Sequence, residues 1–153
     1  MGLEIKKGYG GNSSSCYEDT VAYNNAHADA AARVSGTWVD TADGVTYAAP
    51  SQGGSQFTAQ VWEGHDKGLT SGKLTLLKGN FRAYVEGATV SVAPLPAADI
   101  AFGIPLTVSA IGVMEAAASG DVVVAYCTKA FDTSDDLKFY YESVAVGSRL
   151  TVA

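Results

Sequence analysis

The sequence predicts a mainly β chain: a single small β-barrel or sandwich domain with an extended N-terminal arm and one short helix. From residue 56 onward, apolar and polar side chains alternate in short runs. Gly, Pro or Asp separates these runs at intervals of roughly 8–12 residues, the spacing typical of antiparallel barrels and sandwiches. The length of 153 residues fits one domain, and such a chain can bury a core without disulfide or metal.

The first third of the chain differs in composition from the rest. Residues 1–55 contain six Leu, Ile, Val or Phe residues, whereas residues 56–153 contain 28. A segment so poor in apolar side chains cannot offset its own ordering entropy. We therefore expect residues 1–55 to pack on the β domain of residues 56–153, or to lie as an arm on another chain. Residues 8–15 have the composition of a flexible linker.

Residues 19–34 contain the candidate helix. The stretch is rich in alanine, Asp19 is a suitable N-cap, and Gly36 follows its end. Two asparagines in the middle of the stretch weaken this prediction. Beyond it, Asp40–Gly44 has the composition of a turn between two short strands.

Alternation with a period of two predicts the strands of the β domain. They cover Gln56–Glu63, Lys73–Leu77, Phe81–Glu86 and Thr89–Val92. In the first of them, Phe57, Ala59 and Val61 are expected to share one face. Strand side chains alternate between faces, so Trp62 should point away from that face.

The C-terminal part predicts a buried strand followed by a hairpin. Asp121–Cys127 is a continuous run of β-branched residues, which suits a central strand that is buried on both faces. Leu137–Val146 and Arg149–Val152, joined at Gly147, are expected to form a closing hairpin.

Charge and hydropathy exclude two classes of partner. The chain has 10 Lys and Arg against 16 Asp and Glu, a net charge of −6. Nucleic acids and anionic membranes require clustered Lys and Arg, so we expect neither as a partner. The longest apolar stretch, Ile100–Leu106, is about a third of a membrane span. Met1–Lys7 is not followed by an apolar region, so we expect no signal peptide and folding in a cytoplasm.

No motif in the sequence predicts an enzyme. His27 and His65 are the only histidines, and both lie in polar or weakly structured stretches. The Gly-x-Ser-x-Gly sequence that presents a nucleophilic serine is absent. We therefore expect no catalytic residues, and solvated loops at both histidines.

Metal and cofactor sites are not predicted either. Cys16 and Cys127 lie far apart; they are buried thiols or one long-range disulfide, but not a zinc motif. The acidic residues at 132, 135 and 136 lack the spacing of a calcium loop and are expected to form a solvated turn.

Trp38 and Trp62 are the candidate interface aromatics. A tryptophan that points out of a strand is either an anchor for a protein partner or a surface on which a sugar ring stacks. Packing beneath the N-terminal arm is a third interpretation of Trp62.

Residues 104–127 carry a pattern that resembles the head decoration (cement) proteins of tailed phages. Pro105–Gly112 reads Pro-Leu-Thr-Val-Ser-Ala-Ile-Gly, and Gly120–Val124 reads Gly-Asp-Val-Val-Val. Both are similar to the hairpin and the following strand of that family. Ser109–Gly112 is expected to be a turn with a positive φ at glycine, and Ala116–Gly120 a second turn.

The resemblance implies a structural virion protein that binds the outside of an icosahedral head and stabilises the major capsid lattice. It implies homotrimers, with the major capsid protein as partner and the outer surface of the head as location. In such a protein Leu3, Ile5 and Tyr9 would be capsid-binding residues of the arm, because they resemble the anchors of an added edge strand. A carbohydrate-binding β module and a head-fibre or tail-associated protein remain as alternatives.

Overall fold

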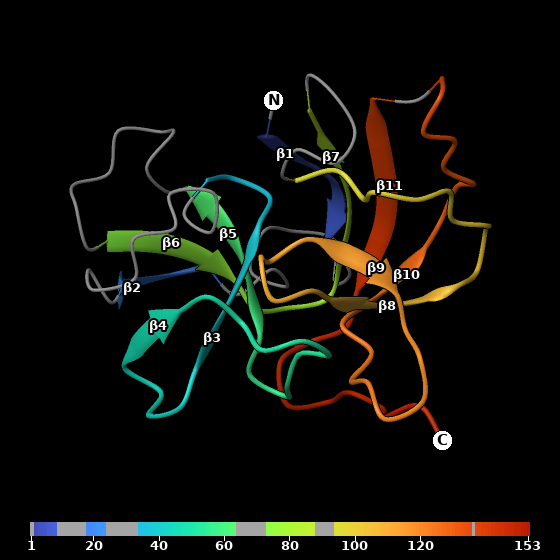
Figure 1. The fold of residues 1–153 in the computed structure, drawn as a ribbon. Helices are drawn as coiled ribbons and strands as arrows, with labels where there is room; N and C mark the ends of the chain where they lie inside the picture. Colours follow the sequence, from blue (N-terminus) through green and yellow to red (C-terminus); the bar gives the residue numbers. More distant parts are fainter. Residues whose placement is uncertain (1, 9–17, 24–33, 64–72, 88–93, 136) are drawn as a thin grey trace.

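The computed structural model describes residues 2–8, 18–23, 34–63, 73–87, 94–135 and 137–153, and confirms a mainly β chain. These residues form eleven strands and no helix (Figure 1). The strands are β1 (Gly2–Gly8), β2 (Glu18–Tyr23), β3 (Trp38–Thr41), β4 (Thr46–Ala48), β5 (Ala59–Glu63), β6 (Lys73–Leu77), β7 (Phe81–Glu86), β8 (Pro105–Val108), β9 (Met114–Ala116), β10 (Ala125–Cys127) and β11 (Lys138–Ser143). The described part of the chain offers no helix of the length and apolarity needed to span a membrane.

The strands belong to two units that lie side by side in Figure 1. On the right is a six-stranded antiparallel sheet in the order β1-β7-β11-β10-β8-β9. On the left, β2, β4, β3, β5 and β6 pair in a closed ring, because β2 pairs with both β4 and β6. The β2–β4 pairing is parallel, and the other described pairings are antiparallel.

A shared core joins the two units. Trp38 of β3 and Leu77 of β6 pack in one cluster with Phe81 and Phe139 of the six-stranded sheet. A smaller cluster inside the ring includes Val61. The side chains of a strand alternate between its faces, so the ring strands contribute to both clusters. Described residues on both sides of residue 55 therefore share one hydrophobic core.

The described N-terminal strands pair with other strands of the chain. Gly2–Gly8, which were predicted to be an extended arm, form strand β1 against β7. The predicted helix over 19–34 is wrong in its first turn, because Glu18–Tyr23 is strand β2. The β-branched and aromatic residues of that segment favour a strand once β4 and β6 are available as partners. Residues 9–17 and 24–33 lie outside the described residues.

Several predicted strands are confirmed and two predictions need correction. β6 and β7 have the predicted bounds, whereas Thr89–Val92 lies outside the described residues. Only the last three residues of the 121–127 run form a strand, β10. The closing hairpin is wrong: β11 pairs with β7 and β10, and the C-terminal segment runs beside residues 120–123, where the amide of Val123 donates to Leu150 O at 2.9 Å.

Candidate functional site

A tight turn fixes the β8–β9 hairpin against β3. The amide of Gly112 donates to Ser109 O at 2.9 Å, which closes the predicted Ser109–Gly112 turn. Gly112 has φ +79°, as the sequence predicted for this glycine. Its carbonyl accepts a hydrogen bond from the amide of Trp38 at 2.9 Å. A Cβ at this position would lie 2.5 Å from Trp38 O, so the close approach requires glycine.

Strand β9 is an edge of the six-stranded sheet and pairs with β8 on one side. The amide of Ala117 donates to Pro105 O and that of Ser109 donates to Val113 O, each at 2.9 Å. In an antiparallel ladder, alternate residues direct their backbone groups to opposite sides. The N–H and C=O groups of Met114 and Ala116 therefore point away from β8. Within the described residues, no hydrogen-bond partner takes these four groups.

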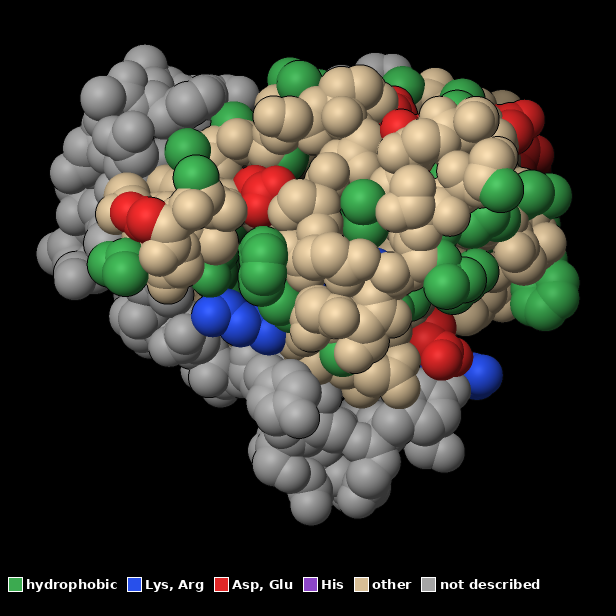
Figure 2. All heavy atoms as spheres, turned by 90° about the horizontal axis from the view of Figure 1, so that it is seen from below, with side chains coloured by type: hydrophobic (Ala, Val, Ile, Leu, Met, Phe, Trp, Pro, Cys, Tyr) green, Lys and Arg blue, Asp and Glu red, His purple; other side chains and the backbone are tan. Residues whose placement is uncertain are grey.

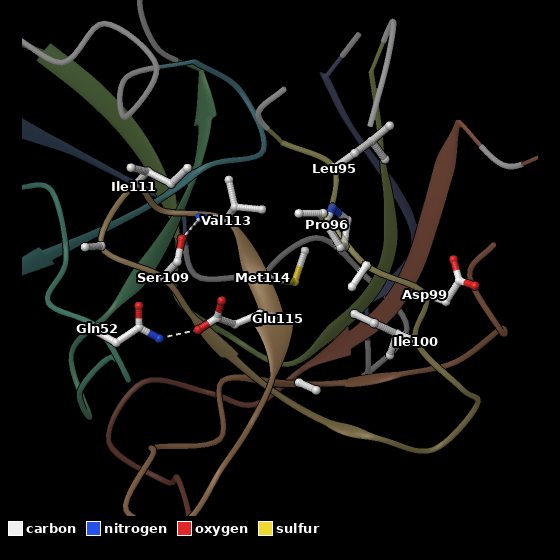
Figure 3. Close-up of a pocket in the computed structure, with 14 residues that line it drawn as sticks. Gln52, Leu95, Pro96, Asp99, Ile100, Ser109, Ile111, Val113, Met114 and Glu115 are labelled. Carbon is white, nitrogen blue, oxygen red and sulfur yellow. Dashed lines mark hydrogen bonds between the residues drawn. The ribbon is translucent and has the colours of Figure 1, made fainter. Parts of the chain in front are cut away.

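A groove of about 430 Å³ lies beside this edge, at which Met114 is 1% exposed and Ala116 is exposed (Figure 3). The β8–β9 hairpin forms one wall, and residues 95–100 form the other. Figure 3 shows the side chain of Met114 between the two walls, on the side where Ile100 lies. Leu95 and Val113 add to the apolar lining. The volume is within the range of sites that bind ligands or partner side chains.

Two carboxylates give the apolar groove a negative charge. Glu115 of β9 accepts a hydrogen bond from the side-chain amide of Gln52. Asp99, on the opposite wall, accepts hydrogen bonds from the backbone amide and the hydroxyl of Thr133 at 2.9 and 2.8 Å. The described lining contains no Lys or Arg. Figure 3 shows the two carboxylates on opposite sides, with Glu115 turned toward Gln52 and Asp99 turned away from β9.

The predicted interface residues take different positions. Trp38 is 1% exposed and belongs to the core, so it is not a surface residue of this chain. It lies on β3 of the ring, and its amide bonds to the β8–β9 hairpin at Gly112. Trp62 is half-buried and packs against the larger core cluster, away from the cluster that contains Ala59 and Val61. Phe57 does not share their face: it precedes β5 and is 56% exposed.

The predicted arm residues are placed only in part. Leu3 lies opposite Val85, and Ile5 lies opposite Ala83, in the β1–β7 ladder. Tyr9 lies outside the described residues. β1 is the other edge of the six-stranded sheet, so the backbone of Leu3 and Ile5 belongs to an edge strand of the chain's own sheet. Binding of these residues to a capsid stays a prediction.

A second surface, on β7 and β11, combines tyrosines and lysines. The rings of Tyr84 and Tyr140 face each other across the two strands, with centroids 5.1 Å apart. Lys138 Nζ lies 4.9 Å from the centroid of Tyr84, and Lys129 Nζ lies 5.2 Å from that of Tyr140. Each tyrosine therefore already makes a cation–π contact within the chain, and this surface is a weaker candidate for binding sugars.

The described residues give no support for a metal site or a reactive thiol. Cys127 is a free, buried thiol, and burial raises its pKa, which makes it a poor nucleophile. Within the described ranges, no group of three His, Cys, Asp or Glu side chains could hold a metal ion. Asp132 accepts hydrogen bonds from the hydroxyl and amide of Ser134, which lower its pKa in an exposed turn. His27, His65 and Cys16 lie outside these ranges.

Among the described residues, a second and smaller groove of about 260 Å³ lies at the Asp43–Gly44 turn and the exposed Phe57. Phe102 and Leu150 are among the exposed large hydrophobic residues. Figure 2 shows the molecule from below, with hydrophobic side chains in several separate groups, most of them on the side of the six-stranded sheet. Scattered apolar residues are normal on protein surfaces. The groove beside β9 is therefore the strongest candidate site.

Comparison with known proteins assigns no family to this chain: no family model matches it, and no curated protein matches it. The functional argument therefore rests on the residues of the chain itself. The sequence singled out the hairpin of the groove, but it gave no signal for the opposite wall at residues 95–100.

Proposed function

We propose that the chain is a structural virion protein that binds the outside of an icosahedral phage head and stabilises the major capsid lattice. One observation carries this proposal. The segment that resembles head decoration proteins, residues 104–127, forms a hairpin with the expected glycine turn at Gly112, and this hairpin builds one wall of the apolar groove. A second glycine with positive φ, Gly120, ends the small-residue turn that the resemblance predicts.

The chemistry of the groove favours binding over catalysis. Its described lining has two carboxylates and the hydroxyl of Ser109, but no histidine or lysine that could activate that hydroxyl. The position of β9 at the sheet edge and the exposed side chain of Ile111 beside the groove suit contact with another macromolecule.

Trimers and the N-terminal strand are part of the same proposal. Several copies on one lattice would combine weak contacts into firm attachment. Leu3 and Ile5 would contact the shell through the outer edge of β1, with Tyr9 beyond them. The carbohydrate-binding alternative is weakened because Trp38 is buried.

Co-sedimentation with undecorated heads of the virus that encodes the chain tests the proposal. We expect saturable pelleting at a fixed ratio to the major capsid protein. Heads that already carry their full decoration are the matched control and should bind no further protein. Absence of pelleting would overturn the proposal, and binding to tails or fibres alone would support the head-fibre or tail alternative.

A further inference from the structure

We propose that the bond between Asp43 and Gly44 is a latent modification site, which Thr41 keeps inactive in the folded chain. When the turn opens, the modification converts Asp43 to isoaspartate. The inference goes beyond the proposed function and does not depend on head binding. Asp43–Gly44 is the only Asp-Gly pair in the sequence, and no Asn-Gly pair occurs. Glycine has no Cβ to hinder an attack by its own nitrogen, so an Asp-Gly pair isomerises more readily than aspartate before a larger residue.

The reaction joins groups of two adjacent residues. The backbone nitrogen of Gly44 attacks Cγ of Asp43 and forms an N–Cγ bond. One carboxyl oxygen leaves as water, which carries away the proton of the amide and that of the carboxyl group. Water then opens the five-membered succinimide. Opening at the former backbone carbonyl of Asp43 leaves the main chain running through Cγ, which is isoaspartate, and no oxidant or reductant is needed.

The turn between β3 and β4, at the lower left of Figure 1, presents this pair to water. Residues 42–46 are all exposed. Gly44 has φ +76°, a conformation that favours glycine, although nothing lies within 4 Å of an added Cβ. The backbone of the turn, and not crowding, therefore keeps glycine after Asp43.

Four hydrogen bonds engage the two reacting groups. Oδ1 of Asp43 accepts from the amides of Val45 and Thr46, each at 2.8 Å, and from the hydroxyl of Thr41 at 3.1 Å. The amide of Gly44 donates to the same hydroxyl at 2.9 Å. The Thr41 hydroxyl thus contacts both the attacking nitrogen and the carboxylate under attack. The nitrogen can turn onto Cγ only after these contacts are broken.

The same contacts keep the carboxyl group of Asp43 ionised. Hydrogen bonds from the backbone amides of Thr46 and Val45 lower its pKa. Ring closure needs the protonated carboxyl group, because an ionised oxygen is a much poorer leaving group than water. Thr41 is therefore a positioning residue, which slows the reaction through the geometry and the charge of its two partners.

Isomerisation at this position would disturb the ring of strands. Isoaspartate adds one methylene to the main chain between β3 and β4. β4 pairs with β3 on one side and with β2 on the other. A change of register at β4 would therefore weaken the closure of the ring.

The test incubates the purified full chain at neutral pH and measures isoaspartate at residue 43 by mass spectrometry with electron-transfer fragmentation. We expect the folded parent to isomerise more slowly than the parent in urea, where the hydrogen bonds of the turn are lost. Thr41→Val removes the hydroxyl and keeps the shape of the side chain. It should raise the rate in the folded chain about threefold to tenfold, the range expected for loss of one hydrogen bond. It should leave the rate in urea unchanged.

Thr41→Ser is the matched control, because it keeps the hydroxyl and should isomerise at the rate of the parent. Circular dichroism checks the fold of each variant. If Thr41→Val does not fold, Asp43→Asn replaces it: its side chain keeps an acceptor oxygen for Val45 and Thr46, and it should deamidate through the same succinimide more slowly when folded.

Equal rates in the folded and the unfolded parent would overturn the inference. It is also overturned if folded Thr41→Val isomerises no faster than the parent. The hydroxyl would then have no effect on the reaction, or it would relay the amide proton to the carboxylate and so promote ring closure.

Discussion

A substitution at Gly112 tests the contact that holds the β8–β9 hairpin against Trp38 of β3. Gly112→Ala places a Cβ 2.5 Å from Trp38 O and forces alanine to φ +79°. Gly120→Ala is the matched control, because Gly120 has φ +89° and nothing within 4 Å of an added Cβ. We expect the control to lower the free energy of unfolding by about 1–2 kcal/mol, and Gly112→Ala to lower it by about 2 kcal/mol more. Urea denaturation measures both, and equal losses would contradict the contact with Trp38.

Tyr141 should make the stability depend on alkaline pH. It is buried, its hydroxyl donates to Gln60, and burial raises its pKa well above 10. The folded state therefore retains the phenolic proton above pH 10 while the unfolded state loses it, so this contribution to stability falls as the pH rises. Burial lowers the pKa of Arg149 to about 10, which acts in the opposite direction.

A comparison of Tyr141→Phe with the parent chain separates the contribution of the Tyr141 hydroxyl to the pH dependence of stability from that of Arg149. We expect the stability difference between the two chains to shift in favour of the variant as the pH rises above 10. Chemical denaturation between pH 8 and pH 11 measures it. A difference that stays constant with pH would show that the hydroxyl of Tyr141 ionises equally in both states.

The sequence predicts the direction of a side chain where the residue lies inside a regular strand, because side chains there alternate between the two faces. The alternation of β5 correctly predicted that Trp62 points away from Ala59 and Val61. The prediction that Phe57 shares the face of Ala59 and Val61 was wrong, because Phe57 lies before the first residue of β5 and the alternation of the strand does not extend to it. The burial of Trp38 was not predictable, because the residues that cover it come from β6, β7 and the hairpin, all distant in the sequence.

A buried arginine holds the C-terminal segment in addition to the backbone hydrogen bonds between residues 120–123 and 150–152. Arg149 is 7% exposed, and its guanidinium donates to Ser55 O at 3.0 Å and to Val144 O at 3.2 Å. Arg149→Met leaves these carbonyls without their donor and should cost about 2–4 kcal/mol of stability. The control Arg82→Met, at an exposed ion pair with Glu142, should cost less than about 1 kcal/mol. Similar losses in thermal unfolding would contradict this account of the segment.

Strand β1 protects an edge of the six-stranded sheet. Deletion of residues 1–8 leaves β7 as the edge, with the backbone groups that now pair with Leu3 and Ile5 exposed. Open edges promote association with other chains. We expect the shortened chain to self-associate more than the full chain in sedimentation velocity. Identical sedimentation of the two chains would show that β1 has no protective role.

Short alternating segments were predictable as elements, but their partners were not. Lys73–Leu77 and Phe81–Glu86 are the predicted strands β6 and β7, yet the turn between them joins the ring to the six-stranded sheet. Periodicity shows which face of a strand is buried and not which strand lies beside it. The prediction of one continuous strand over 121–127 was wrong for the same reason. Val122 bridges to Thr151, and only residues 125–127 pair with β11.

In the molecule as a whole, the fold class follows from the sequence and the site does not. Alternating strands and frequent turns were sufficient to predict a β domain. The groove combines Gln52, residues 95–100 and residues 109–116, which no local pattern connects. The groove lies at an edge of the six-stranded sheet because β9 is the last strand in the strand order. Only the hairpin could be anticipated, because its turn requires a glycine.

A density map of heads saturated with this protein tests the central claim most directly. We expect ordered density on the outer surface of the head, at a fixed number of copies per capsid subunit. The β8–β9 hairpin should face the shell. Saturated heads without added density on the shell, or with the groove facing solvent and empty, would contradict this account.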